Sequence, residues 1–161
     1  FPWDIYRNAE YAREKLGFGQ AQRCIRYPDE PQREADLAKW ERKGLPIWWG
    51  RSDGSFEGFD SIDDAIDDLD YYMMYIKFGF GRATRMASRL IQNGHMTRDQ
   101  GLELVRRYDG EFPRRYLPQI CEYLGMTEQE IRDVADTHRN PEIWLKNEFT
   151  GDPWILKHAP V

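Results

Sequence analysis

The sequence predicts a mainly α-helical protein: a helical, bundle-like C-terminal half follows an irregular, aromatic-rich N-terminal half that holds one small β-hairpin. Three observations predict this fold class. Apolar residues recur with a helical period after residue 61, and helix caps and glycines divide that region into short helices. Before residue 60, prolines and glycines interrupt any long element.

The N-terminal half still offers three short elements. Asn8–Leu16 has a helical pattern that ends at Gly17, and the stretch at 31–44 is typical of a short helix that begins near Pro31 and closes at Gly44. In "LPIWWGRSDGSFEGF", Asp53-Gly54 separates two short apolar runs. A turn dipeptide between such runs predicts the small hairpin.

The first strong helix is expected to begin at Ser61, a good N-cap residue with Asp64 at the capping-box position. Its apolar residues follow a 3.6-residue period and predict one buried face: Ile62, Ala65, Ile66, Leu69, Tyr72, Met73 and Ile76. Two glycines then end this helix.

Further helices are expected at 82–93, 97–108, 113–124 and 127–138, with a last short helix after Asn140-Pro141 and an extended tail at 150–161. Thr97 with Gln100, and Thr127 with Glu130, have the spacing of capping boxes. Glycines at the ends of these segments are typical helix stops.

Composition bounds the class of protein. The 161 residues are 40% hydrophobic and 14% aromatic, which suits one globular domain, and the net charge of −5 argues against a general nucleic-acid binder. No apolar run approaches the roughly 18 residues of a membrane span, and there is no signal peptide. Two cysteines without a metal or redox motif favour a reducing, cytoplasmic setting.

The chain begins "FPWDIYRN", without Met and already in aromatic sequence. This start favours a piece of a longer protein. We therefore expect residues 1–161 to form a single domain, the C-terminal fragment of a longer enzyme. Residues 1–60 would be the irregular lead-in that follows a nucleotide-binding core, and residues 61–161 the helical part.

Charge is unevenly placed. Residues 57–70 hold seven acids and no base, whereas residues 82–115 hold eight arginines against four acids. The acidic run suits a solvated helix start, because the helix dipole favours carboxylates there. It lacks the alternating Asp spacing and central Gly of an EF-hand loop.

The stretch "YIKFGFGRATR" poses the main functional question. Gly79 and Gly81 permit backbone angles that other residues avoid, and the free N–H groups of the next helix would face an anion. Lys77, Arg82 and Arg85 would add positive charge. No strand precedes the loop, so it is neither a Walker loop nor a dinucleotide fingerprint. The alternative is a plain glycine corner between packed helices.

Three residues are candidate acids or bases. His95 follows a helix stop, and Asp109 and Glu111 flank Gly110 in "YDGEFP". An ordinary loop histidine and an Asp-Gly turn are the alternatives. No metal site is expected from His138 and His158.

The stretch from Tyr71 to Pro113 resembles the C-terminal region of the bacterial N-acetyl sugar amidotransferases of surface-polysaccharide (lipopolysaccharide O-antigen) biosynthesis. The opening "FPWD" is similar to the segment after the nucleotide-binding core of that family. The matching motifs are "KFGFGRAT" (77–84), "NGH" (93–95), "TR" (97–98) and "YDGEFP" (108–113).

The resemblance implies an ATP-dependent enzyme that converts an N-acetyl group of a nucleotide-linked sugar to an acetamidino group. The ammonia would come from glutamine through a partner glutaminase pair. The PP-loop motif Ser-Gly-Gly-x-Asp-Ser, which binds ATP in that family, is absent from this sequence. ATP would therefore be bound mainly by another domain, and this fragment alone would be inactive.

Together, the loop and the resemblance give the candidate site residues. A phosphate of the sugar nucleotide or of ATP would be held by Lys77, Gly79, Gly81, Arg82, Thr84, Arg85 and Arg98. The candidate acid–base residues are His95, Asp109 and Glu111, and no residue is assigned a catalytic role. No metal, membrane or nucleic-acid partner is expected, whereas a homo-oligomer is compatible with the sequence. The alternative function is a non-catalytic helical module that binds RNA or a partner protein, or that serves oligomerisation.

Overall fold

The structure, a computed structural model, describes residues 3–18, 51–57, 64–148 and 153–158. Its helices are α1 (Ile5–Leu16), α3 (Asp67–Phe78), α4 (Arg82–Gln92), α5 (Arg98–Tyr108), α6 (Leu117–Leu124) and α7 (Glu128–Thr137). Within these residues the strands β1 (Trp144–Lys146) and β2 (Trp154–Leu156) pair antiparallel. The prediction of a mainly helical fold with one small hairpin is confirmed.

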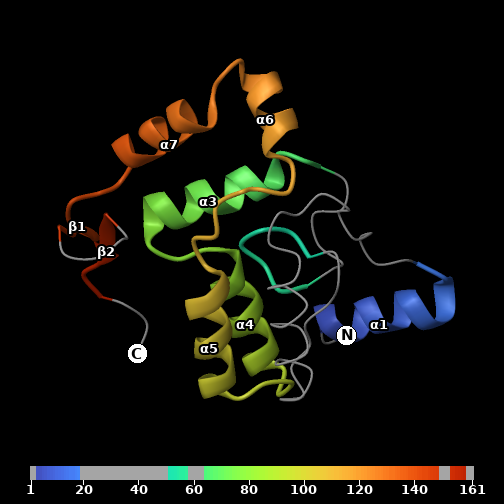
Figure 1. Cartoon of the computed structure of the whole chain (residues 1–161). Helices are drawn as coiled ribbons and strands as arrows, with labels where there is room; N and C mark the ends of the chain where they lie inside the picture. The colour runs from blue at the N-terminus through green and yellow to red at the C-terminus, as the bar shows by residue number, and fades with distance from the viewer. Residues whose placement is uncertain (1–2, 19–50, 58–63, 149–152, 159–161) are drawn as a thin grey trace.

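Helix α3 organises the molecule (Figure 1). The pair α4–α5 packs on one side of it and the pair α6–α7 on the other, while the β1–β2 hairpin lies beside its C-terminal end. Helix α1 lies away from α7, on the other side of the molecule. Helix α3 therefore lies between the two helix pairs. The hairpin and α4 meet at the turn that follows its C-terminal end.

Two apolar clusters fill these layers. The larger one lies between α4 and α5, where Met86, Leu90, Leu104 and Tyr108 are almost fully buried and Phe56 packs against them. The smaller one joins α3 to α7 through Tyr72, Ile76 and Ala135. Burying a side chain of this size contributes about 1.5–3 kcal/mol, so apolar contact holds α4 to α5 in the larger cluster and α3 to α7 in the smaller one.

Local caps set most helix ends. Both predicted capping boxes are present: Thr97 with Gln100 opens α5, and Thr127 with Glu130 opens α7. In each box the threonine hydroxyl accepts from a backbone N–H of the first turn, and the partner side chain accepts from the threonine N–H. These short-range signals therefore place both helices.

The predicted hairpin position is wrong in the part that the structure describes. Asp53 and Gly54 do form a turn, but residues 51–57 contain no strand, and the rest of 45–59 lies outside the described residues. The pairing instead joins Trp144 to Leu156 and Lys146 to Trp154. The predicted extended tail thus supplies β2.

The starts of α3 and α6, and one predicted helix, also differ from the sequence prediction. Helix α3 begins at Asp67, because a turn precedes it in which Ile66 N donates to Asp64 Oδ1 over 2.9 Å. Helix α6 begins at Leu117 rather than near Pro113. The short helix predicted after Asn140 is absent, because Asn140 Oδ1 accepts from Glu142 N and makes a turn that leads into β1. The predicted helix at 31–44 and the predicted cap at residue 61 lie outside the described residues.

Candidate functional site

The glycine corner joins α3 to α4 against the hairpin. Gly79 ends α3 with a φ of 74°, a left-handed conformation that favours glycine. A Cβ atom placed there would lie 2.8 Å from Ile143 Cγ2 and 3.1 Å from Leu156 Cδ2. The hairpin therefore packs directly onto the backbone of this corner. This close packing, together with the left-handed φ, explains why a glycine stands at position 79.

The N-terminus of α4 already carries an anion from the chain itself. Gly81 N donates to Asp109 Oδ2 over 2.9 Å, Thr84 N donates to Asp109 Oδ1 over 3.2 Å, and the Thr84 hydroxyl donates to the same carboxylate. Burial raises the pKa of Asp109, while these hydrogen bonds act to lower it. The backbone N–H groups at the start of α4 do bind an anion, as expected for a helix N-terminus. In this structure the anion is the carboxylate of Asp109.

Three arginines line one face of α4. Arg82, Arg85 and Arg89 stand at positions i, i+3 and i+7, so they share one side of the helix, away from Thr84. The Arg82 guanidinium lies 5.3 Å from the centroid of the Tyr71 ring. Burial, followed by the like charge of Arg85, lowers the pKa of Arg82 to about 10, even though Glu57 opposes this change. The face therefore carries a local excess of positive charge.

Glu57 lies beneath this arginine face. Its side chain is 3% exposed, and one carboxylate oxygen, Oε2, has no hydrogen-bond partner within the described residues. Burial raises its pKa to about 7, against the opposing attraction of Arg82 and Arg89. A buried carboxyl group that titrates near neutrality beside arginines was not singled out by the sequence, where it reads as the first acid of a solvated run.

The other predicted phosphate ligands do not gather at this face. Lys77 is exposed at the end of α3, with its ammonium 5.5 Å from the centroid of the Phe78 ring. Arg98 begins α5, so the length of α4, about 16 Å at 1.5 Å per residue, separates it from Arg82. The structure brings Arg82 and Arg85 together and leaves Arg98 at the opposite end of the helix pair.

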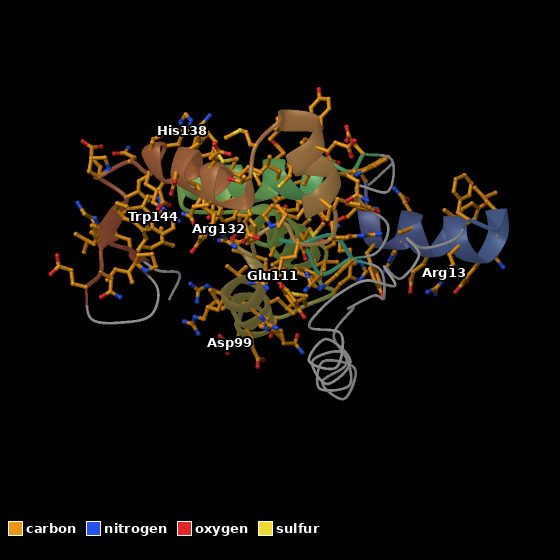
Figure 2. The ribbon with its side chains drawn as sticks, turned by 45° about the horizontal axis from the view of Figure 1, so that its top comes forward. Arg13, Asp99, Glu111, Arg132, His138 and Trp144 are labelled. Atoms are coloured by element: carbon orange, nitrogen blue, oxygen red, sulfur yellow. The ribbon has the colours of Figure 1, made fainter. Side chains whose placement is uncertain are left out.

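Glu111 fastens the buried segment 51–57. Both of its carboxylate oxygens accept from Arg51, over 2.6 and 2.8 Å, and Oε2 also accepts from Gly54 N. The Arg51 guanidinium lies 4.3 Å from the centroid of the Tyr108 ring. Figure 2 shows Glu111 near the middle of the molecule. This bidentate, ring-stacked pair gives Glu111 a structural role.

Asp53 holds the next turn of the chain. Its Oδ2 accepts from the backbone N–H groups of Arg114 and Arg115, over 2.7 and 2.9 Å. This contact keeps 113–116 as a turn, which explains why α6 begins later than predicted. Nearby Asp68 is 1% exposed, and burial together with Asp53 raises its pKa to about 7.

His95 lies at the far end of the α4–α5 pair. Its Nε2 is 2.7 Å from Asp4 Oδ2, and its ring centroid is 5.0 Å from that of Tyr6. Asp4 also caps α1, because its side chain accepts from Arg7 N. His95 thus ties α1 to the helix pair, and the structure does not bring it together with Asp109 or Glu111.

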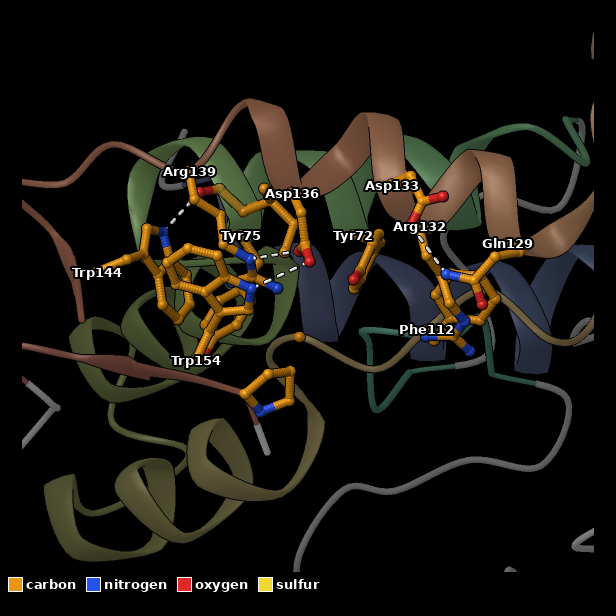
Figure 3. A pocket seen from close by; sticks show the side chains of 13 residues that line it. Tyr72, Tyr75, Phe112, Gln129, Arg132, Asp133, Asp136, Arg139, Trp144 and Trp154 are labelled. Atoms are coloured by element: carbon orange, nitrogen blue, oxygen red, sulfur yellow. Dashed lines mark hydrogen bonds and ion pairs between the residues drawn. The ribbon is translucent and has the colours of Figure 1, made fainter. Parts of the chain in front are cut away.

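A pocket of about 340 Å³ opens between α3, α7 and the hairpin, on the other side of the glycine corner. Figure 3 shows its wall, on which Arg139 lies beside Trp144 and Trp154, and Arg132 lies against Phe112. Sequence reasoning missed this site. One available signal is the spacing of Gln129, Arg132, Asp133 and Asp136 at i, i+3, i+4 and i+7, which places four polar residues on one face of a helix.

The described residues lack two further features. They contain no group of three or more His, Cys, Asp or Glu residues that could hold a metal ion. No helix among them is long and apolar enough to cross a membrane. His138 lies exposed at the outer edge of α7 (Figure 2), and Cys121 carries a free thiol.

Comparison with models of known protein families places part of the chain. The family model described as "LPS biosynthesis protein WbpG-like, C-terminal domain" matches residues 53–158. That range includes α3 to α7, the hairpin, the arginine face and the pocket. No curated protein sequence matched the chain. Because the model covers well over half of the 161 residues, the chain belongs to the family of WbpG-like C-terminal domains of LPS biosynthesis proteins.

Proposed function

We propose that this chain is the C-terminal part of an ATP-dependent amidotransferase that converts the N-acetyl group of a nucleotide-linked sugar to an acetamidino group. The observation that carries the proposal is the family match over 53–158, which contains the whole stretch 71–113 that resembles the N-acetyl sugar amidotransferases. In this reaction the amide C–O bond breaks after ATP activates the oxygen, and ammonia supplies the nitrogen of the new C–N bond.

The contacts of the candidate acids support a substrate-binding role for this part. Asp109 caps α4, Glu111 holds Arg51, and His95 contacts Asp4. Each of the three is already engaged by the chain, so none is the best choice for a general acid or base. ATP activation is assigned to a PP-loop domain elsewhere in the protein, and ammonia delivery to a partner glutaminase pair. The setting is then the cytoplasm, and a homo-oligomer is compatible.

The arginine face of α4 is the best place for a phosphate of the sugar nucleotide. Arg82, Arg85 and Arg89 share one side of the helix. Burial, and after it the like charge of Arg85, lowers the pKa of Arg82, and a bound phosphate would offset that like-charge repulsion. Guanidinium groups bind phosphate through two parallel hydrogen bonds. Because Asp109 occupies the amides of Gly81 and Thr84, this binding would rest on side chains.

The test is genetic. Deleting the coding sequence in its own organism should leave LPS whose acetamidino sugar now carries a plain N-acetyl group, as mass spectrometry of the released glycan would show. Complementation with the intact gene should restore the acetamidino group. Unchanged sugar composition would contradict the proposal. If RNA is then found to bind with a steep dependence on salt, the alternative of an RNA-binding module gains support.

A further inference from the structure

The pocket between α3, α7 and the hairpin has walls of aromatic rings. Trp144 and Trp154 come from the two strands, Tyr72 and Tyr75 from α3, and Phe112 from the segment before α6. The rings are held in place: Trp144 Nε1 donates to Ile76 O over 2.7 Å, and the Tyr75 and Trp144 rings meet edge to face at 5.2 Å. The volume of about 340 Å³ is at the lower end of the roughly 300–1,000 Å³ seen for small-molecule pockets.

The two arginines of the pocket are already paired. Arg139 Nε donates to Asp136 Oδ1 over 2.7 Å, and its guanidinium lies 4.4 Å from the Trp144 ring centroid. Arg132 donates from two nitrogens to Glu128 Oε1, over 2.9 and 2.6 Å, and lies 3.4 Å from the centroid of Phe112. Figure 3 shows both guanidinium groups flat against rings. With Arg132 and Arg139 against Asp133 and Asp136, the formal charge of the lining is zero.

Hydrogen-bonding groups sit at the rim. Gln129 Nε2 donates to Asp133 Oδ1 over 2.8 Å, and both side chains line the pocket from an exposed part of α7. A carboxylate accepts at both oxygens, and the amide oxygen of Gln129 is a further acceptor. Asp136, which also lines the pocket, accepts at Oδ2 from Trp154 Nε1 over 3.0 Å. The rim is therefore rich in acceptors, and a matching ligand presents several donors.

We propose that this pocket binds the uncharged ring of the sugar itself, a pyranose that carries hydroxyl and acetamido groups. The C–H face of a pyranose stacks on aromatic rings. Arginines cover Trp144 and Phe112. The rings that remain partly exposed for stacking are therefore Tyr75 and Trp154. The hydroxyl groups of the sugar donate to paired carboxylate and amide acceptors such as Asp133 and Gln129. A phosphate is disfavoured, because both arginines are neutralised and two carboxylates line the same space. This assignment rests on the proposed function and divides the substrate: phosphate at the arginine face of α4, sugar ring in the pocket.

The experiment compares three probes on the complete protein that contains this chain: UDP-N-acetylglucosamine, N-acetylglucosamine and UDP. Saturation-transfer NMR should show the strongest transfer to sugar-ring protons. Calorimetry should show that the double variant Gln129→Ala with Asp133→Ala binds both sugar-bearing probes at least about tenfold more weakly, with UDP affinity unchanged. Both residues are exposed, so the melting temperature should stay close to that of the wild type. Glu122→Ala, an exposed acid on α6 outside the pocket, is the matched control.

Two results would overturn the pocket assignment. One is sugar binding that the double variant leaves unchanged or that the wild type lacks. The other is an equal loss of UDP affinity, which would make the pocket a site for the nucleotide. Formation of the acetamidino product by the wild-type protein is measured separately. If the double variant loses sugar binding while the wild type forms no acetamidino product, that combination would contradict the amidotransferase proposal and leave the pocket assignment standing.

Discussion

At the scale of single residues, the molecule uses its carboxylates in unequal ways. Asp109 and Glu111 are two residues apart in sequence, yet one caps α4 and the other holds Arg51. Sequence spacing suggested a pair for proton transfer, because it does not reveal to which side of the chain each side chain turns. Glu57 and Asp68, by contrast, are buried acids whose pKa values are raised to about 7.

The raised pKa of Glu57 makes stability depend on pH. Its folded-state pKa of about 7 exceeds the ordinary 4.5, so the folded protein binds more protons than the unfolded chain between those values. The free energy of unfolding therefore falls as pH rises through that window. Glu57→Gln should remove the pH dependence that Glu57 contributes. The decrease in the free energy of unfolding between pH 5 and pH 8 should then be smaller than in the wild type by on the order of 1–3 kcal/mol.

Chemical denaturation at pH 5 and pH 8 measures that difference. Asp68 shares the same window, so the wild type and the variant should both keep a residual slope. An exposed acid that serves as the control, Glu122→Gln, should leave the pH dependence as it is in the wild type. Identical slopes for Glu57→Gln and the wild type would show that Glu57 stays ionised throughout this range.

The exposed arginines of α4 give a second prediction at this scale. Arg85→Ala with Arg89→Ala should weaken binding of a nucleotide-linked sugar by about tenfold or more, since each charge-assisted hydrogen bond contributes about 1.5–3 kcal/mol. Arg98→Ala removes one positive charge from an exposed position at the far end of the helix pair and should leave binding unchanged. Calorimetry measures the affinity of each variant for the nucleotide-linked sugar. Equal losses of affinity in the double variant and in Arg98→Ala would contradict phosphate binding at the arginine face.

At the scale of elements, the corner between α3 and α4 shows what sequence patterns can and cannot predict. The helix ends at Gly79, Thr97 and Thr127 follow from caps that act within a few residues. The start of α6 does not, because it depends on Asp53, which accepts from Arg114 N across 61 positions of sequence. The hairpin does not either, because it depends on the pairing of β1 with β2, which no cap signals. A short apolar run after Asn140-Pro141 suits a helix or a strand, and its pairing with 154–156 decides for the strand.

Gly79→Ala tests the packing of the hairpin on this corner. An alanine would take up a strained φ of 74°, which costs about 1–2 kcal/mol, and its Cβ would also press on Ile143 and Leu156. Gly94→Ala is the matched control, because Gly94 has a φ of 75° and no atom within 4 Å of the added Cβ. Denaturation should show a larger loss of stability for Gly79→Ala. Equal losses would mean that the hairpin does not contact this corner.

At the scale of the whole molecule, α3 separates two surfaces with different chemistry. Helix α4, which carries the arginine face, lies on one side of α3, and α7, which lines the aromatic pocket, lies on the other (Figure 1). The glycine corner joins α3 to α4. The sequence predicted the helical class and the basic character of 82–115. It could not predict the pocket, because its walls come from four segments that only the tertiary fold brings together.

The account rests on the conversion of an N-acetyl sugar to its acetamidino derivative. The most direct measurement incubates the complete protein with ATP, the proposed glutaminase pair, glutamine labelled with ¹⁵N in the side-chain amide, and candidate nucleotide-linked N-acetyl sugars. Mass spectrometry of the sugar then follows the product. The account predicts a product in which ¹⁵N has replaced the amide oxygen, formed only when ATP is present. Sugars that all keep their acetyl oxygen while glutamine is hydrolysed and ATP is consumed would contradict it.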